Sequence, residues 1–516
     1  MRIIELVLLL LNCATLFFMV FRRFSKAFNR STKAIWIGGA ALNLIVLLLH
    51  IVLEGLRIQM LFSYAFVFAL VSVAVIVTLK KPREKEKPKR RRVVVFKGIG
   101  TGFVFLALSL SAILASLLPV PTLPTPTGNY AVGVQHLHLV DENRNNSFFT
   151  GSLDKRELMV KIYYPAEDEA SQPFVHYFRG SKELAGAYLK ENGFPGAFFQ
   201  QLAYAQTHSK ENLQLARQHS SYPVILFSHG WGFSIELYTS LCEGLASHGY
   251  IVIAIDHTYL NGASLLPDRI VRTSEAPIFS GSLLPETLRG MAQTMTDDSI
   301  FVIDVLEKLD SGNRDSIFRN RLDLDNIGIA GHSLGGAASY NLAINDSRIP
   351  SRINAAINLD GDPLFTPEPN AELAPILMLT NGENWVVNPD ILMPKLEDMP
   401  EEYYALILED FGAEAVYNAE RQREAQVIRE LSVILADSQT LFFIKGSLHS
   451  AYSDLGFCLG KPLEQLFGIG TTGPAKTLEI TQALMLAYFD QHLKGQPGSS
   501  LDTLVETYSE LQRVKL

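Results

Sequence analysis

Four long apolar runs in the first 120 residues limit most strongly how this 516-residue chain can fold. They cover residues 3–21, 34–53, 59–79 and 98–120, and charged side chains are almost absent from them. Each run is close to the roughly 20 residues that an α-helix needs to cross the hydrocarbon core of a bilayer. The sequence therefore predicts a transmembrane region of four helices in residues 1–120.

Basic residues are concentrated in the first and third loops between these runs. The second loop contributes only Arg57, whereas the third carries a dense basic stretch from Lys80 to Arg92. The first loop holds Arg22, Arg23, Lys26, Arg30 and Lys33. Because basic loops stay in the cytoplasm, the pattern predicts a multi-pass protein of the cell membrane. Its amino terminus and everything after the fourth run would then be extracytoplasmic.

The charge balance changes sharply after the apolar runs. Residues 1–118 hold 17 Lys and Arg against 4 Asp and Glu, whereas the remainder holds 28 against 49. The part of the chain with a net positive charge is the part that contains the apolar runs, so the sequence gives no indication of nucleic-acid binding. The cysteines are Cys13, Cys242 and Cys458, and two buried free thiols are favoured over a Cys242–Cys458 disulfide. No Cys or His spacing is typical of a metal site, and we expect no cofactor.

A proline-rich segment separates the two parts of the chain. Pro119, Pro121, Pro124 and Pro126 predict a stiff linker at residues 121–128. Strand and helix patterns alternate from residue 129 onward. Strands are expected at 130–140, 157–164, 222–228, 250–256, 327–330, 355–359, 375–380 and 440–444, and helices at 194–206, 211–218, 235–248, 285–309 and 477–493. This alternation predicts an α/β domain at 129–516 with a mostly parallel sheet covered on both faces.

A charged, mostly helical stretch at residues 384–436 interrupts this alternation late in the domain. It is equally well interpreted as an inserted lid over a binding site and as a solvated helical excursion.

A strand, a sharp turn and a helix meet at Ser333. The apolar run 327–330 leads into Gly331-His-Ser-Leu-Gly335, and a helix-compatible run follows at 337–344. This is the context in which G-x-S-x-G forms the nucleophile elbow of an α/β-hydrolase, with the serine hydroxyl exposed on a strained turn. Ordinary Gly-rich turns share the pentapeptide, so the interpretation depends on a base and an acid elsewhere in the chain.

Chain order restricts the choice of base, because this fold supplies its triad in the order Ser, Asp or Glu, His. Among the histidines, only His449 and His492 come after Ser333 and a plausible acid that follows it. His492 lies on the polar side of a terminal amphipathic helix. His449 lies in a loop at the carboxyl end of the strand 440–444, where catalytic groups gather in open α/β sheets. The sequence favours His449 as the general base.

Position along the chain does not by itself decide which carboxylate is the acid of the triad. Asp360 ends the strand 355–359, Asp362 lies two residues further on, and Glu383 follows the next strand. Both strand ends are used for the acid in proteins of this fold.

The oxyanion hole requires two backbone N–H donors. The N–H of Leu334, directly after the candidate nucleophile, is one. The other is expected from Trp231, in the Gly-rich turn at 227–233 that follows a buried strand.

Four segments of this chain together resemble platelet-activating factor acetylhydrolase of the secreted, calcium-independent type. They are Val160-Lys-Ile-Tyr-Tyr-Pro165, the Phe227-Ser-His-Gly-Trp-Gly stretch with its continuation at 244–257, Gly331-His-Ser-Leu-Gly-Gly336, and Lys445-Gly-Ser-Leu-His449. The resemblance covers about residues 129–495 and excludes the apolar runs. It implies a Ser-Asp-His carboxyl-ester hydrolase whose acid lies one strand after the elbow, which selects Asp360 over Glu383. It also implies oxyanion donors at Trp231 and Leu334.

Together these features predict a membrane-anchored serine hydrolase that cleaves a lipid or small ester near the outer membrane face. Because the 384–436 stretch lies between acid and base, the family's preference for short or oxidised acyl chains on phospholipids is not carried over. Acyl transfer to an acceptor other than water would use the same triad. A non-catalytic membrane sensor with a hydrolase-like ligand-binding domain is the alternative from a different class.

Overall fold

The computed structural model describes most of the chain. The described residues are 1–21, 32–79, 90–149, 153–276, 285–312, 316–345, 352–365, 373–381, 414–419, 421–422, 425–426, 440–496 and 500–514.

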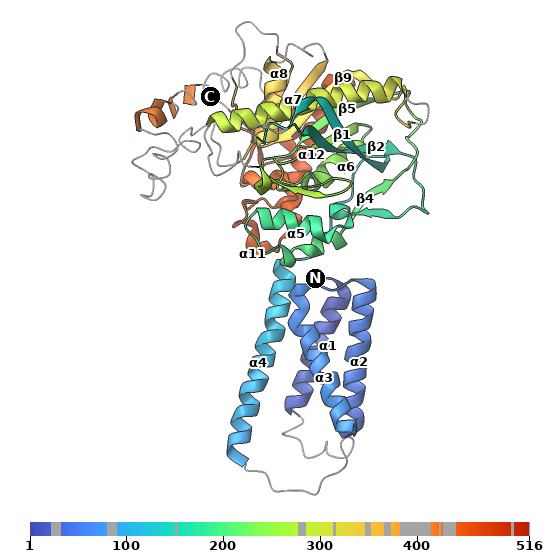
Figure 1. Cartoon of the computed structure of the whole chain (residues 1–516), viewed down its shortest axis with the longest axis vertical. Helices are drawn as coiled ribbons and strands as arrows, with labels where there is room; N and C mark the ends of the chain where they lie inside the picture. Colours follow the sequence, from blue (N-terminus) through green and yellow to red (C-terminus); the bar gives the residue numbers. More distant parts are fainter. Residues whose placement is uncertain are drawn as a thin grey trace.

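Among the described residues, four helices are long and apolar enough to cross a membrane. They are α1 (Ile3–Phe21), α2 (Thr32–Leu53), α3 (Leu61–Leu79) and α4 (Arg90–Leu117), and they match the four predicted runs except that α4 begins earlier. They form a bundle below the rest of the molecule, and the helix ends that flank residues 22–31 and 80–89 lie at its far end (Figure 1). The bundle interior is apolar where Leu8, Met60, Val67 and Ala115 pack together.

The bundle is joined to the α/β domain by direct contacts as well as by the chain. The Gln59 amide donates to the side chain of Gln201 at 3.0 Å, and the Tyr204 hydroxyl donates to the Leu56 carbonyl at 2.9 Å. The segment predicted as a stiff linker also packs against the domain, because Leu123 is buried in the domain core. The N–H of Gly128 donates to the Ser247 hydroxyl at 3.0 Å. The bundle and the domain therefore form a packed junction.

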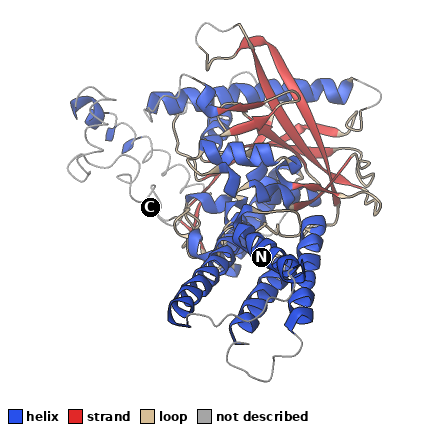
Figure 2. Cartoon of the chain, turned by 60° about the horizontal axis from the view of Figure 1, so that its bottom comes forward, coloured by secondary structure: helices blue, strands red, loops and turns tan. Residues whose placement is uncertain are grey.

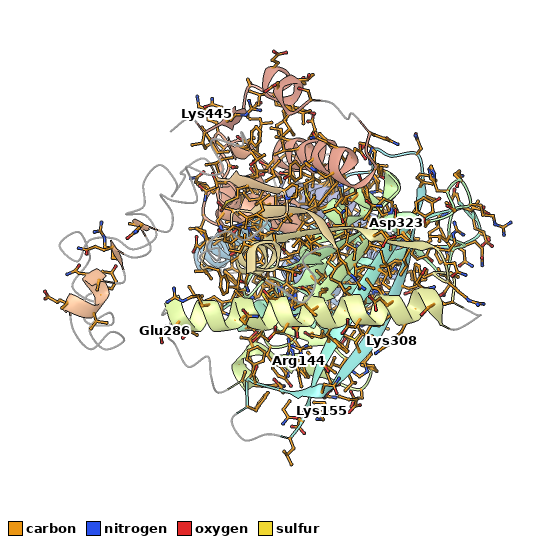
Figure 3. All side chains as sticks on the ribbon, turned by 90° about the horizontal axis from the view of Figure 1, so that it is seen from above. Arg144, Lys155, Glu286, Lys308, Asp323 and Lys445 are labelled. Carbon is orange, nitrogen blue, oxygen red and sulfur yellow. The ribbon has the colours of Figure 1, made fainter. Side chains whose placement is uncertain are left out.

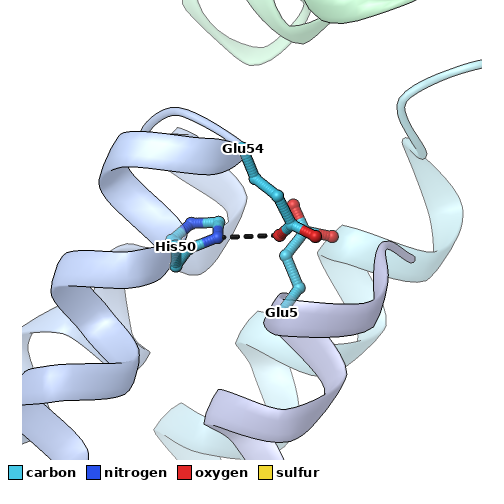
Figure 4. A group of neighbouring side chains, drawn as sticks. All are labelled: Glu5, His50 and Glu54. Atoms are coloured by element: carbon cyan, nitrogen blue, oxygen red, sulfur yellow. Dashed lines mark hydrogen bonds and ion pairs between the residues drawn. The ribbon is translucent and has the colours of Figure 1, made fainter.

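Polar side chains meet at the domain end of the bundle, where the ligand atoms of Glu5, His50 and Glu54 lie within 4.8 Å of one another (Figure 4). That spacing would suit a metal ion. Each group already has protein partners, however. Both Glu5 oxygens accept from Arg57 at 2.8 Å, and His50 contacts Glu54 at 3.0 Å and the Tyr64 hydroxyl at 2.6 Å. The group is a closed ion-pair network, as expected for charges in a membrane region.

Within the described residues, the main sheet of the α/β domain has 11 strands in the order β13-β12-β11-β10-β9-β5-β6-β2-β1-β4-β3. Neighbours from β12 to β6 pair in parallel, and β13, β2 and β3 add antiparallel pairs. The bounds are β1 (Ala131–Asn145), β2 (Lys155–Ala166), β3 (Phe174–His176), β4 (Gln206–Glu211), β5 (Tyr222–Ser228), β6 (Ile251–Asp256), β9 (Leu322–His332), β10 (Ile353–Leu359), β11 (Ile376–Thr380), β12 (Leu441–Ile444) and β13 (Leu511–Arg513). The predicted mostly parallel sheet is confirmed.

Both faces of this sheet are buried under helices (Figure 2). Because side chains alternate along a strand, Ile225 and Phe227 of β5 enter one core while Val224 and Leu226 enter the other. The first core packs against α6 (Thr239–Ser247) and α12 (Pro474–Leu493), and the second against α7 (Pro285–Ser311) and α8 (Leu334–Asn345). The buried free thiols Cys242 and Cys458 lie in the first core.

The predicted helices at 194–206 and 211–218 were wrong. The first range holds two short 3-10 turns, η4 (Gly196–Phe198) and η5 (Gln200–Tyr204), and β4 begins at its end. The second range opens with Asn212 in a left-handed conformation (φ 58°), and its Leu215 pairs with Ala166 of β2. Pairing with β2 outweighs the local helical pattern here. The helix α5 (Lys182–Glu191) was not predicted, and most of the 384–436 stretch lies outside the described residues.

A buried charge cluster fixes α7 to the sheet. Arg156 of β2 binds Asp298 of α7 through two hydrogen bonds of 2.6 and 3.1 Å, and Arg144 adds a third contact at 2.8 Å. Figure 3 shows α7 running between Glu286 and Lys308 above the strand that carries Arg144. The Arg156 and Asp298 side chains are both at most 1% exposed. These charges must stay paired, because an unpaired buried charge is costly.

Arg156→Met tests this cluster, since methionine keeps much of the volume but removes two charged hydrogen bonds from Asp298. We expect the free energy of unfolding, measured by chemical denaturation of the solubilised protein, to fall by about 3–5 kcal/mol. The matched control is Arg217→Met, because Arg217 is 76% exposed and lies 3.7 Å from Glu167. That change should cost less than about 1 kcal/mol. Equal effects of the two substitutions would contradict the argument.

Candidate active site

The turn between β9 and α8 has the geometry of a nucleophile elbow. Ser333 lies between the two elements with φ at 54°, a strained left-handed conformation for a residue other than glycine. A Cβ atom on Gly335 would lie only 2.3 Å from the Ser228 carbonyl oxygen, so this position accepts no side chain. Because Gly335 has no side chain, the start of α8 packs directly against the end of β5. The predicted strand–turn–helix context of Ser333 is present.

Three predicted site residues follow three parallel strands and converge at one edge of the sheet. Ser333 follows β9, Asp360 follows β10, and His449 follows β12 after a short loop. The His449 Nε2 atom lies 3.0 Å from Ser333 Oγ, and its Nδ1 atom lies 2.5 Å from Asp360 Oδ2. The three side chains form a continuous Ser–His–Asp hydrogen-bonded relay. This arrangement can transfer a proton from the hydroxyl to the imidazole.

The Asp360 carboxylate is held in place from the neighbouring strand end. It is 1% exposed and accepts hydrogen bonds at 2.9 Å from both the backbone N–H and the side-chain amide of Asn381. Asn381 follows β11 directly and was not predicted as a site residue from the sequence. Its position at the end of a strand could have indicated it. Of the alternative acids, Asp362 affects His449 through its charge, and Glu383 lies outside the described residues. The alternative base, His492, lies on α12 against Tyr488.

The pKa of His449 reflects two opposing influences. Burial lowers the pKa of the imidazole, but the hydrogen bond and charge of Asp360, with the charge of Asp362, outweigh burial and raise the pKa above its usual value. Since Nδ1–H donates to Asp360, the neutral ring leaves Nε2 free to accept the Ser333 proton. The relay therefore favours the imidazolium that forms when the serine attacks.

Two backbone N–H groups beside Ser333 are available as donors. Leu334 is the first residue of α8, where the first N–H groups of a helix lack intrahelical acceptors. On either side of Trp231, the N–H of Gly230 donates to the Tyr238 hydroxyl and the N–H of Gly232 to the Leu260 carbonyl. The Trp231 N–H itself has no acceptor among the described residues. The Gly230 backbone lies against Ser333, since a Cβ there would be 3.0 Å from the serine Cβ.

An apolar pocket of about 170 Å³ adjoins this edge of the sheet. Phe233 and Ser450, which line it, are close in sequence to Trp231 and His449. Apart from Asn192 and Cys458, its remaining lining is aliphatic and aromatic, and includes Phe194, Phe199, Leu202, Leu455, Leu459 and Phe467. It suits a hydrocarbon group rather than a charged one.

Comparison with known proteins gives the family. The model of the family platelet-activating factor acetylhydrolase, isoform II, matches residues 118–264 and 300–509. The chain belongs to this family. The resemblance inferred from the sequence motifs is thus confirmed, and the protein is a carboxylic ester hydrolase.

Individual relatives agree with this assignment. The platelet-activating factor acetylhydrolase of Bos taurus is 25% identical over 419 residues, covering 74% of this chain and 80% of the relative. A probable 1-alkyl-2-acetylglycerophosphocholine esterase of Arthroderma benhamiae is 26% identical and covers 50% of this chain and 64% of its own length. The solved structure of a ferulic acid esterase from Streptomyces cinnamoneus aligns with a TM-score of 0.54 at 26% identity. It covers 77% of this chain and 100% of the esterase. The predicted α/β-hydrolase fold is confirmed.

The charges around His449 predict the pH dependence of ester hydrolysis. Protonated His449 cannot accept a proton, so kcat/KM should rise with pH through the pKa of His449. The midpoint should lie above the value of about 6.5 for an unperturbed histidine, because the net shift of this pKa is upward.

Asp362→Asn removes one of the charges that raise this pKa. We expect the acid limb of the kcat/KM profile to move to lower pH while the plateau rate is retained. Asp268→Asn, at a carboxylate 70% exposed and paired with Arg269, serves as the control and should leave the limb unchanged. An acid limb that stays in place or moves upward in Asp362→Asn would contradict this account.

Proposed function

We propose that the protein is a membrane-anchored serine esterase that hydrolyses lipid or small carboxylic esters at the outer face of the membrane. The observation that carries the proposal is the hydrogen-bonded relay of Ser333, His449 and Asp360, with 3.0 and 2.5 Å between the interacting atoms. A ligand-binding sensor would have no need for such a relay. The esterase names of the family and of the relatives support the same reaction class.

In the first half of the reaction, Ser333 Oγ attacks the ester carbonyl carbon while His449 Nε2 takes the hydroxyl proton. Asp360 holds the Nδ1–H and stabilises the imidazolium. The carbonyl oxygen becomes an oxyanion that accepts hydrogen bonds from the N–H groups of Trp231 and Leu334. Fixed donors of this kind stabilise developing charge better than water does, because they need no reorganisation.

In the second half, the tetrahedral intermediate collapses and the C–O bond to the alcohol breaks. His449 gives its proton to the departing alkoxide, which leaves an acyl ester on Ser333. Water then enters, loses a proton to His449 and attacks the acyl carbon. The acid is released and the Ser333 hydroxyl regains its proton.

The substrate proposal rests on the apolar pocket and on its position relative to the bundle. One wall contains Phe199 and Leu202, and the Gln201 side chain between them binds Gln59 of the bundle. Another wall ends at Leu459, and the N–H of the next residue, Gly460, donates to the Leu117 carbonyl at 2.8 Å. A hydrocarbon group bound here would lie between the bundle and the relay. An ester carrying a lipid chain fits this position. Within this class of substrates, a phospholipid with a short or oxidised acyl group is the more specific proposal.

Ser333→Ala tests the nucleophile. We expect complete loss of labelling by a fluorophosphonate probe and a fall in p-nitrophenyl acetate hydrolysis of at least about 10⁴-fold, because the covalent step is removed. Asp360→Asn should lower kcat by about 10⁴-fold through the wrong imidazole tautomer. His492→Gln is the matched histidine control and should retain activity. Labelling that persists in Ser333→Ala would refute the assignment.

The outward placement of the catalytic domain is tested separately. The two basic loops, between α1 and α2 and between α3 and α4, follow helix ends at the far end of the bundle and support a cytoplasmic position for that end. We expect a phosphatase reporter that is active only outside the cytoplasm to be active at the carboxyl terminus of the full chain. The same reporter inserted at residues 80–89 should be inactive. The reverse pattern would place the active site in the cytoplasm.

A further inference from the structure

The histidine next to the candidate nucleophile has no role in the reaction just described, yet both of its ring nitrogens are bonded. His332 is fully buried. Its Nδ1 atom lies 2.7 Å from the Tyr238 hydroxyl, and its Nε2 atom lies 2.9 Å from the backbone carbonyl oxygen of His449. Its ring also lies against the His449 ring, with centroids 4.7 Å apart. A buried group satisfied on both sides fixes whatever it is bonded to.

The proton positions in this network follow from its chemistry. The His449 carbonyl can only accept, so Nε2 of His332 carries the proton. Burial, and then the charge of nearby His449, lowers the pKa of His332 well below its usual value, so the ring is neutral and Nδ1 has a lone pair. The Tyr238 hydroxyl therefore donates to Nδ1, and its oxygen accepts the Gly230 N–H at 3.1 Å. The direction of each hydrogen bond is thus determined.

This network joins the two loops that flank Ser333. At one end it holds the N–H of Gly230, the residue before the proposed oxyanion donor Trp231. At the other end it holds the carbonyl of His449, the proposed base. The His449 loop is held from its other side through Ser450, whose N–H donates to the Gly468 carbonyl at 2.8 Å. His332 ties the backbone of this loop to the elbow, in addition to the side-chain hydrogen bond between His449 and Ser333.

We propose that His332 and Tyr238 are positioning residues that set the placement of the Trp231 N–H relative to the His449 imidazole around Ser333. This inference rests on the proposed function. Neither side chain touches the reacting atoms. Their effect is on geometry, since a misplacement of about 1 Å in a catalytic group can cost about 10²-fold in rate. The order of bonds is Gly230 N–H to Tyr238, Tyr238 O–H to His332, and His332 Nε2–H to His449.

Two substitutions of His332 separate positioning from packing. His332→Gln can place an amide N–H where Nε2–H stands and so keep the bond to the His449 carbonyl. His332→Asn can accept from Tyr238 at the Nδ1 position but is too short to reach His449. For p-nitrophenyl acetate hydrolysis by the full-length protein, we expect His332→Asn to lower kcat by about 10–100-fold with a smaller change in KM. His332→Gln should stay within several-fold of the unaltered protein. The rate of inactivation by a fluorophosphonate should follow the same order.

A second pair of variants covers the case in which His332→Asn does not fold. Tyr238→Phe removes the hydroxyl that links Gly230 to His332 and should lower kcat by about 10-fold or more. Tyr340→Phe is the matched control, because Tyr340 is also fully buried and its hydroxyl has no hydrogen-bond partner among the described residues. It should leave kcat unchanged. Thermal unfolding of each variant reports whether the protein is folded.

The outcomes separate this inference from the function on which it rests. If Ser333→Ala is inert while folded His332→Asn or Tyr238→Phe keeps the kcat of the unaltered protein, the positioning role is overturned and the proposed function stands. Equal losses in His332→Asn and His332→Gln also overturn it, because they indicate packing alone. Activity that persists in Ser333→Ala refutes the proposed function instead.

Discussion

Parallel pairing of β5, β9, β10, β11 and β12 is the constraint on which the site depends. Parallel strands end at the same edge of a sheet, so residues far apart in sequence are delivered side by side without any local signal between them. The register sets their relative height: His332 of β9 lies opposite Leu359 of β10, and Leu359 lies opposite Leu379 of β11. The residues that follow these strands therefore meet within hydrogen-bonding distance. Two separate apolar cores, one on each face, keep the strands in this register.

Much of this arrangement was predictable because it is encoded in periodicity and chain order. Apolar length identified the four bundle helices, and alternating strands and helices identified the sheet. Ser333 and His449 could be selected because the elbow has a local signature and only two histidines follow it with a plausible acid. Asp360 needed the family resemblance, since Asp362 and Glu383 were equally placed by position.

The residues that sequence reasoning missed are those whose roles depend on contacts between distant segments. Asn381, which follows β11, donates to Asp360, which follows β10. Tyr238, in the 3-10 turn Ile235–Tyr238 before α6, contacts His332 at the end of β9. No spacing rule relates such positions. The wrong helices at 194–206 and 211–218 failed for a related reason: β4, which lies between them, pairs with β1 and β3, and Leu215 pairs with Ala166 of β2, so contacts with distant segments override local propensity.

The junction between the bundle and the domain has a consequence for what counts as the catalytic unit. Leu118, at the end of the fourth helix, is part of the domain core, and the segment that lines the apolar pocket is bonded to the loop between α2 and α3. A fragment that starts after the proline-rich segment would lack the core residues Leu118 and Leu123 and would expose one wall of that pocket to water. The four helices are therefore part of the scaffold of the apolar pocket and more than a detachable anchor.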